Sequence, residues 1–464
     1  MSASVRPVPG PTRPYEFPAV QRSALANGVR LVVAPMPRLP IVTVFALVEA
    51  GAVHDARGAE GTAVLTARTM LEGAGALDGP ALTDRLEGLG TTLIGTADWD
   101  SSSLRCTATT SRLGEVFSLF TDVLRTPSFP AADVARRRDE RLADLVQELA
   151  EPRGLADERF SGLLYDRSAR FARGAAGTTR SVGTLEAERV RAFHAAQYTP
   201  KATTLIFVGD VTPAQVQALA ERALGAWESG AVSGFSAPNS AGIASDLAAQ
   251  AVRRTVIIDK PGAPQTELRV GHVGVPRSHP DHLAVVVMNA ILGGLFSSRI
   301  NLNLRERHAF TYGASSAFEW RRAAGPFVVS TAVKSEVTGR AMEEILREID
   351  GMRAAPPSQS EVELATEYLA GVFPIRYETT SAVAGALAAA KLFALPEDWF
   401  SNYRARVRAI TPAEVHAAAS RHLDPSRLLA LAVGDASLIA EPLRDLGIGA
   451  VVTRASGYDP SEDA

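Results

Sequence analysis

The chain has 464 residues, more than a single hydrophobic core usually serves, so two or three domains are expected. Hydrophobic residues make up 46% and charged residues 21%, a balance typical of a soluble globular protein. The net charge of −3 gives no overall attraction to nucleic acid or to an anionic membrane, so neither is expected as a partner.

The only cysteine, Cys106, excludes an intrachain disulfide and a thiolate metal cluster. The first 25 residues contain five prolines and no apolar run, so we identify no signal peptide. No stretch is expected to reach the ~20 apolar residues of a membrane span. These features predict a cytoplasmic protein, or a periplasmic or secreted one if a signal peptide has been removed.

The elements of the first half begin after a Pro-rich arm at residues 1–22. Two strands are predicted in "GVRLVVAPMP" and "IVTVFALVEAGAV" because their apolar residues are short runs bounded by turn signals. Long helical patterns follow at 60–72, 79–88, 111–125 and 131–150. The basic run Arg136–Arg138 is followed by acidic residues, which favours a solvated helix face.

One block of sequence occurs twice. "YTPKATTLIFVGDVTPAQVQALAERAL" begins at Tyr198 and "LDPSRLLALAVGDASLIAEPLRDLG" at Leu423, each preceded by a helical pattern. Each block has a proline, a buried strand and Val-Gly-Asp at equal spacing, and the Gly-Asp pair suits the turn that leaves the strand. Equal spacing indicates a duplication.

In the second half, as in the first, the predicted strands come first and the long helices follow. Strands are predicted in "RTVIIDKP" and "TELRVGHVGV", and helices at 280–293, 297–308, 337–353 and 358–372. This grouping indicates an α+β fold with mostly antiparallel sheets. The predicted divisions are the arm 1–22, an N-terminal domain 23–227, a linker 228–250, a C-terminal domain 251–455 and a tail 456–464.

The stretch "GGLFSSRINLNLRERHAFTYGASSAF", from Gly293 to Phe318, resembles the "LRE…GL.Y" signature in the C-terminal domain of the M16 zinc peptidases (pitrilysin or insulinase type). "LANGVRLVVAP", "EAGAVHDARGAEGTAVLTARTMLEGAG", "HPDHLAVVVMNAILGG" and both Val-Gly-Asp blocks resemble further landmarks in family order. The resemblance implies two homologous α/β-roll domains, each a mostly antiparallel sheet with helices packed on one face. It also implies that Arg305 and Tyr312 contact the substrate backbone or the tetrahedral intermediate.

The resemblance places the family's zinc motif, H-x-x-E-H, on the helix after Gly61-Thr62-Ala63. The two histidine positions hold Val64 and Arg68, and the general-base glutamate position holds Ala67. The third ligand position falls on Asp144. Zinc needs imidazole, thiolate or carboxylate donors and a guanidinium cannot serve, so we expect no hydrolytic zinc site in this chain.

The remaining histidines are not expected to replace the lost ligands. His279 and His282 form an HxxH, but they lie in a turn at a helix start, where capping or surface roles predominate. His308 lies in a segment where the family tolerates many residues. His416 and His422 share one helix with no carboxylate at ligand spacing. No metal or other cofactor is therefore expected in this chain.

The resemblance favours a non-catalytic subunit of a heterodimeric M16B zinc endopeptidase, inactive alone. A partner with an intact H-x-x-E-H would hold the zinc, and this chain would close the peptide chamber and supply Arg305 and Tyr312 in trans. The substrate would be an unfolded peptide, added as a strand to the edge in residues 90–105, where Ile94-Gly95 replaces the family's Asn-Ala. The alternative is a structural or scaffold subunit, like the core proteins of respiratory complexes, without a role in proteolysis.

Two of the altered ligand positions carry opposite charges. Because the family's ligands converge on one ion, Arg68 and Asp144 are expected to form an ion pair, directly or through one water. Such a pair is expected to be buried, so that removing Asp144 alone costs about 3–5 kcal/mol. The alternative is that Arg68 extends to solvent and Asp144 is a surface residue of its helix.

Overall fold

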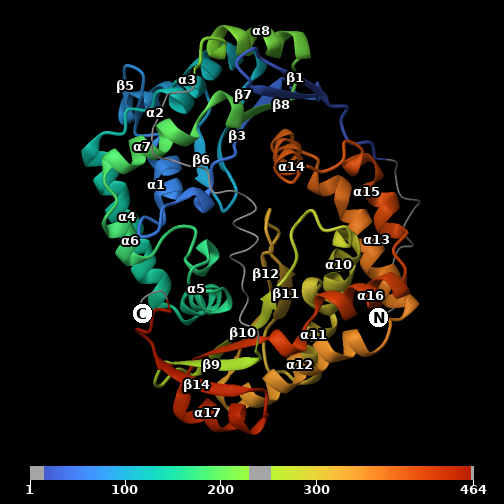
Figure 1. The fold of residues 1–464 in the computed structure, drawn as a ribbon. Helices are drawn as coiled ribbons and strands as arrows, with labels where there is room; N and C mark the ends of the chain where they lie inside the picture. Colours follow the sequence, from blue (N-terminus) through green and yellow to red (C-terminus); the bar gives the residue numbers. More distant parts are fainter. Residues whose placement is uncertain (1–14, 229–251, 461–464) are drawn as a thin grey trace, which may run out of the picture.

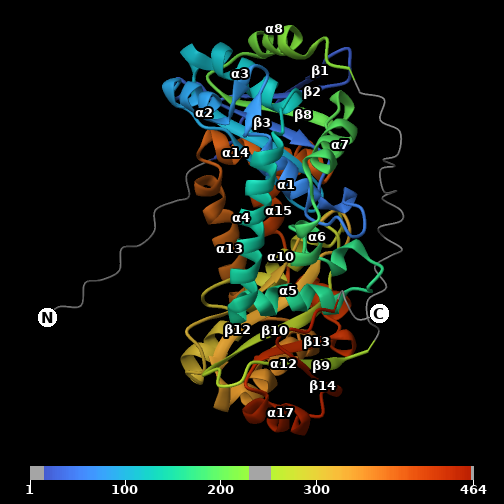
Figure 2. The same cartoon turned by 90° about the vertical axis from the view of Figure 1, so that its left-hand side faces the viewer.

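The computed structural model describes residues 15–228 and 252–460. Two six-stranded sheets lie at opposite ends of an elongated molecule, and helices α4 (Ala131–Ala150) and α13 (Gln359–Arg376) run lengthwise between them (Figures 1 and 2). Apart from residue 228, the predicted linker 228–250 lies outside the described residues, as do residues 1–14 of the arm and 461–464 of the tail.

The first sheet has the strand order β1-β2-β8-β3-β7-β6. All neighbours in it are antiparallel except β2 and β8, whose parallel register pairs Arg30 with Thr204. Its strands are β1 (Gln21–Ala24), β2 (Arg30–Pro35), β3 (Ile41–Val48), β6 (Ile94–Ala97), β7 (Ser102–Thr109) and β8 (Thr203–Gly209); a separate hairpin joins β4 (Gly73–Ala74) to β5 (Leu77–Asp78).

The second sheet has the order β11-β12-β10-β13-β9-β14 and repeats this plan except at its outer strand, because β14 is parallel to β9 whereas β1 is antiparallel to β2. Its parallel pair β9–β13 corresponds to β2–β8, and the antiparallel run β13-β10-β12-β11 corresponds to β8-β3-β7-β6. The predicted mixture of helices and mostly antiparallel sheets is thereby confirmed. Its strands are β9 (Arg254–Asp259), β10 (Gln265–Val273), β11 (Ala314–Phe318), β12 (Pro326–Lys334), β13 (Leu429–Gly434) and β14 (Ala450–Ala455).

The two Val-Gly-Asp blocks form β8 and β13, and every residue of both strands is buried, as their continuous apolar runs predict. Their final glycines lie against the neighbouring strand. Gly209 has φ +143°, and a Cβ there would lie 2.1 Å from the Ile41 carbonyl oxygen. A Cβ at Gly434 would lie 2.7 Å from the Thr266 hydroxyl. Only glycine allows these close approaches without a shift of the neighbouring strand.

Each half covers one face of its sheet with its own helices. In the first half the apolar sides of these helices form one core with the inward residues of β2, β3, β7 and β8. The helices are α1 (Thr62–Thr69), α2 (Gly79–Gly88), α3 (Leu113–Arg125), α6 (Thr179–Gly183), α7 (Ala187–Gln197) and α8 (Pro213–Leu224). The second half has α10 (His282–Asn289), α11 (Arg299–Asn301), α12 (Thr338–Ala354), α15 (Trp399–Arg408), α16 (Pro412–His422) and α17 (Ala436–Asp445).

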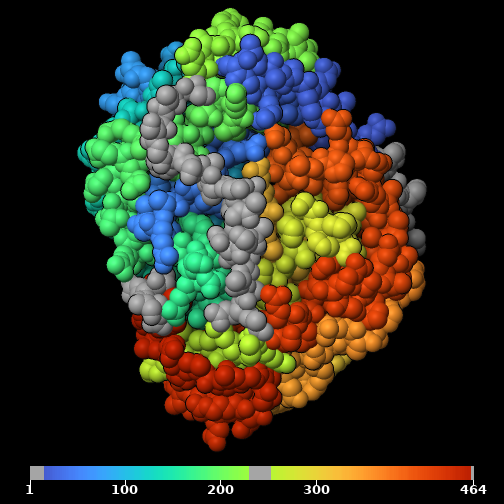
Figure 3. Space-filling model, in the orientation of Figure 1, coloured from blue at the N-terminus to red at the C-terminus, as the bar shows by residue number. Residues whose placement is uncertain are grey.

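The other face of each sheet is covered by a helix from the opposite half. Helix α14 (Thr380–Leu392) places Val383, Ala384 and Leu387 against the outer face of β2, β3 and β8. Helix α5 (Pro152–Leu164) places Leu155 and Phe160 against β9 and β13 of the second sheet. We call this exchange the reciprocal helix packing. The line along which blue-to-green and yellow-to-red residues meet is visible in Figure 3.

Parts of the predicted arm and tail are ordered against the body of the protein. Phe17 stacks on Phe400 with ring centroids 4.4 Å apart, and the Tyr15 hydroxyl donates to the Tyr377 carbonyl at 3.1 Å. At the other end, Tyr458 of the predicted tail packs against the apolar cluster formed by α5, β9 and β13. These contacts attach the first described residues to the second half.

The predicted helices at 280–293 and 297–308 are less regular than their apolar pattern indicates. Helix α10 continues into a π-helical turn at Ala290–Gly294, and α11 continues into a second at Leu302–Arg307. By length and composition alone, residues 282–307 could cross a membrane, contrary to our expectation from the sequence. Because 61% of the apolar window is buried inside the protein, we describe it as a core segment.

We expect Leu387→Ala in α14 to destabilise the first sheet, although residue 387 belongs to the second half. Leu387 is 4% exposed and contacts the first sheet, and deleting a buried leucine side chain typically costs about 2–5 kcal/mol. Hydrogen–deuterium exchange should then rise in 203–209 as well as in 380–392. Leu364→Ala, at an exposed position, is the control. Faster exchange confined to 380–392 would contradict the reciprocal helix packing.

Candidate functional site

Helix α1 carries the positions at which the resemblance places the family's zinc motif, and it is fixed at its first turn by a buried carboxylate. Asp55 accepts hydrogen bonds from the backbone N–H groups of Gly61 and Ala63, each at 2.9 Å, and from Arg170 at 3.0 Å. Burial raises the pKa of Asp55 to about 6 even though Arg170 opposes that shift. Gly61 begins the helix with φ +96°, a left-handed conformation that favours glycine.

The three altered positions share one side of α1, as their spacing predicts. Val64 is half-buried, Ala67 is buried and Arg68 is exposed. Strand β6 crosses this helix so closely that a Cβ at Gly95 would lie 2.3 Å from the Ala67 carbonyl oxygen. The edge strand of the first sheet therefore lies directly on the helix that holds the altered motif.

The expected contact between Arg68 and Asp144 is present, because Arg68 Nη1 lies 3.4 Å from Asp144 Oδ2. The expectation that the pair is buried is wrong, since the side chains are 43% and 51% exposed. Asp144 lies on the solvent side of α4, with Arg141 Nη1 a further 3.9 Å away. Water screens such a pair, so it stabilises the fold by about 0–1 kcal/mol only.

A stronger ionic contact between α1 and α4 was not predicted from the sequence. Glu72, just after α1, is buried and accepts from Arg136 at 2.6 Å and from Arg137 at 2.5 Å. The mixed charges of the basic run indicated a solvated helix face. The structure shows instead that Arg136 and Arg137 also pair with the buried Glu72. Its acidic partner comes from another part of the chain, where local charge patterning gives no signal.

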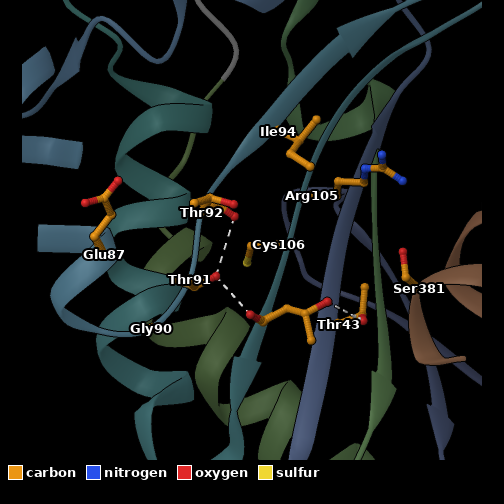
Figure 4. A pocket seen from close by; sticks show the side chains of 10 residues that line it. Thr43, Glu87, Gly90, Thr91, Thr92, Ile94, Arg105, Cys106 and Ser381 are labelled. Atoms are coloured by element: carbon orange, nitrogen blue, oxygen red, sulfur yellow. Dashed lines mark hydrogen bonds between the residues drawn. The ribbon is translucent and has the colours of Figure 1, made fainter. Parts of the chain in front are cut away.

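The edge of the first sheet beside α1 is open. Among the described strands β6 pairs only with β7, and only as far as Arg105, so β7 continues beyond the end of β6. A cavity of about 520 Å³ lies at this step, with Thr91 and Thr92 on one side, Arg105 and Ser381 on the other, and Cys106 between them (Figure 4). Burial raises the pKa of the Cys106 thiol to about 12, which disfavours a nucleophilic thiolate.

Arg305 and Tyr312 lie on the opposite half, in the segment between α11 and β11. The Arg305 guanidinium lies 4.6 Å from the Phe296 ring centroid, and its Nε is 3.5 Å from Glu306. Tyr312 is 94% exposed, and its hydroxyl makes no hydrogen bond within residues 15–228 and 252–460. No hydrogen bond joins Arg305 to Tyr312 within the described part of the chain; Arg305 is half-buried and Tyr312 is exposed.

The histidine pairs of the sequence are rearranged by the fold. His282 is buried, with its ring 4.2 Å from that of Trp320, and among the described residues it does not belong to the group of side chains around His279 that could share one metal ion. His416 bonds to the Arg353 carbonyl at 2.8 Å. His422 has the carboxylate partner that sequence spacing did not reveal, because its Nε2 lies 2.7 Å from Asp281 Oδ2, 141 residues away.

Comparisons with known proteins find similarity to one family. Residues 184–369 match the family model described as the peptidase M16 inactive domain. The chain is 21% identical to an uncharacterized zinc protease of Streptomyces coelicolor (86% of each chain covered), and 23% identical to one of Mycobacterium tuberculosis (91% of this chain and 95% of that protein). Residues 184–369 are thus similar to the M16 inactive domain, and most of the chain is similar to proteins named zinc proteases.

Solved structures agree with this similarity. A peptidase M16 inactive domain from Pseudomonas fluorescens superposes with a TM-score of 0.81 at 25% identity, covering 90% of this chain and 98% of that chain. A protease from Helicobacter pylori has the same TM-score at 15% identity, covering 90% and 99%, which shows the shared fold alone.

The residues of this M16-like chain do not fit a zinc ion at the positions on α1 where the resemblance places one. The side chains of Val64 and Ala67 have no atom that can coordinate zinc. Asp144, the one carboxylate at the expected ligand positions, is paired with the cationic Arg68. No hydrolytic step is therefore assigned to α1.

We expect Asp144→Ala to change the free energy of unfolding by no more than about 1 kcal/mol, because both side chains are exposed. A double-mutant cycle with Arg68→Leu, followed by urea unfolding, isolates the pair. A coupling energy of about 3 kcal/mol or more would match a buried pair and contradict the exposed geometry.

Proposed function

We propose that this chain is the non-catalytic subunit of a heterodimeric M16B zinc endopeptidase. The proposal rests on the contrast between helix α1 and the segment that holds Arg305 and Tyr312. Helix α1 holds no zinc ligand and its Arg68 is paired with Asp144, whereas Arg305 and Tyr312 remain accessible on the other half. A partner with an intact H-x-x-E-H would hold the zinc ion and the general base.

Arg305 and Tyr312 would act on the peptide bound to the partner. A guanidinium and a phenol are both hydrogen-bond donors, so both suit a peptide carbonyl oxygen or the negative charge that develops on it. Tyr312 has no other acceptor within the described part of the chain, and Phe296 holds the Arg305 guanidinium by a cation–π contact. Neither donor would have to give up a strong internal partner.

An unfolded peptide is the substrate class that the open sheet edge favours. An extended chain can add to β6 by main-chain hydrogen bonds, and the cavity at the step beside β7 could receive its side chains. The close approach of Gly95 to Ala67 keeps this edge against α1. We propose that binding here holds the peptide while the partner cleaves it, in the cytoplasm.

The rival function is a scaffold subunit that has the M16 fold without a role in proteolysis. A scaffold has no need of a Tyr312 that is exposed and has no hydrogen-bond partner within residues 15–228 and 252–460. A neighbouring open reading frame that encodes an M16 chain with H-x-x-E-H would favour the heterodimer.

The isolated chain should not hydrolyse peptides, with or without added zinc, because α1 supplies neither the ligands nor the general base. The measurement is cleavage of a quenched fluorescent peptide library. Hydrolysis that persists through purification and disappears in an Arg68→Ala variant would place a working centre on α1 and refute the proposal.

Mixed with an H-x-x-E-H partner, the chain should raise peptidase activity, and Arg305→Ala or Tyr312→Phe should lower kcat/KM. Loss of one donor to a developing oxyanion typically costs ~10²–10³-fold. Arg307→Ala and Tyr368→Phe are matched exposed controls. Co-elution of every variant with the partner separates catalysis from assembly, and full activity of both site variants would favour the scaffold.

A further inference from the structure

The fold gathers three metal-binding side chains in the second half, far from α1 in the sequence. His279 lies in the turn before α10, Asp281 immediately precedes that helix, and His422 is the last residue of α16. One donor atom from each lies within 4.8 Å of the other two. We call these three residues the His–Asp–His cluster.

The backbone around the cluster is fixed by hydrogen bonds and helix packing. The N–H of His282 donates to the His279 carbonyl and the N–H of Val285 to the Asp281 carbonyl, at 3.0 and 2.9 Å. Helices α10 and α16 pack against each other, which holds the turn beside the end of α16. The three side chains therefore start from a defined arrangement, and none of them is fully buried.

Asp281 is the anionic member of the cluster, and a metal ion has to displace the Arg421 guanidinium from it. Its Oδ2 lies 2.7 Å from His422 Nε2 and 2.8 Å from Arg421 Nη1, and the rings of His279 and His422 meet edge to face at 4.7 Å. The carboxylate is thus the single anionic group among two imidazoles and a guanidinium. Arg421 is 60% exposed, so it can move into solvent when another cation takes its place.

We propose that the His–Asp–His cluster binds one divalent ion of the Zn²⁺, Ni²⁺ and Cu²⁺ class. Two imidazoles and one carboxylate are donors that suit these ions, and water can complete the coordination because the cluster is only partly buried. With bonds of about 2.0–2.2 Å, tetrahedral ligand atoms lie about 3.3 Å apart, so modest side-chain rotations close the cluster. The ion displaces the Arg421 guanidinium, and the neutral His422 imidazole binds it through Nε2 while its proton resides on Nδ1.

This site is distinct from the zinc position of the partner in the proposed heterodimer and does not depend on it. It would join the start of α10 to the end of α16 and stabilise the second half. Ligand binding to the folded state raises its stability, so the ion should raise Tm. No hydrolytic role is assigned to it.

Isothermal titration of the metal-free full chain with Zn²⁺ tests the proposal. We expect one saturable site, weakened more than about tenfold in His279→Ala and in His422→Ala. His416→Ala is the matched control, because this histidine lies on the same helix and bonds to the Arg353 carbonyl instead. Absence of saturable binding, or unchanged binding in His422→Ala, would overturn the proposal.

Two further variants leave the three proposed ligands unchanged, so they test the site even if a ligand variant folds poorly. Arg421→Gln retains all three ligands and removes the competing cation, so it should bind Zn²⁺ more tightly and show a larger rise in Tm. Asp144→Asn should bind as the wild type does. Weaker binding in Arg421→Gln would contradict the competition, and loss of binding in Asp144→Asn would place the ion at α1 instead.

Discussion

The reciprocal helix packing is the interaction on which the rest of the structure depends. A sheet covered on one face only would leave the outer side of β8 and β13 in water, yet every residue of both strands is buried. The missing cover comes from α14 for the first sheet and from α5 for the second. Neither half can therefore bury its central strands alone, and the relative position of the halves is set by the same contacts that complete their cores.

Helix α1 is likewise held in position by contacts within the protein. The helix is held by Asp55 at its start, by threonine hydroxyls that bond back to its own carbonyls, and by strand β6 against Ala67. None of these contacts needs a metal ion. The position of α1 is thus set by packing and hydrogen bonds within the protein.

Much of the fold could be predicted from the sequence, because its signals are local. Apolar runs between turn residues located β8 and β13, and the repeated Val-Gly-Asp fixed their equivalence. Counting along the family motif predicted the contact of Arg68 with Asp144. The burial of that pair was predicted wrongly, since spacing specifies which residues meet and says nothing about how much of the protein covers them.

The rest could not be read from the sequence because it depends on partners distant in the chain. Helix α14 is rich in alanine, and nothing in its own residues indicates that it covers the sheet of the other half. Glu72 gains its arginines, and His422 its carboxylate, only when the fold brings separate segments together. Cavities at a step in a sheet, such as that beside Cys106, likewise arise from strand lengths that propensities do not define.

The exchange of α5 and α14 has the form of an isologous interface, in which each of two similar bodies presents the same surface to the other. The single chain thus resembles a dimer of one repeat whose subunits have been joined covalently. Joining them replaces a concentration-dependent association by an intramolecular one, with an effective concentration set by the connecting segment. Once joined, the two repeats no longer need identical sequences. Each can change outside the interface of α5 and α14 while the interface itself is kept.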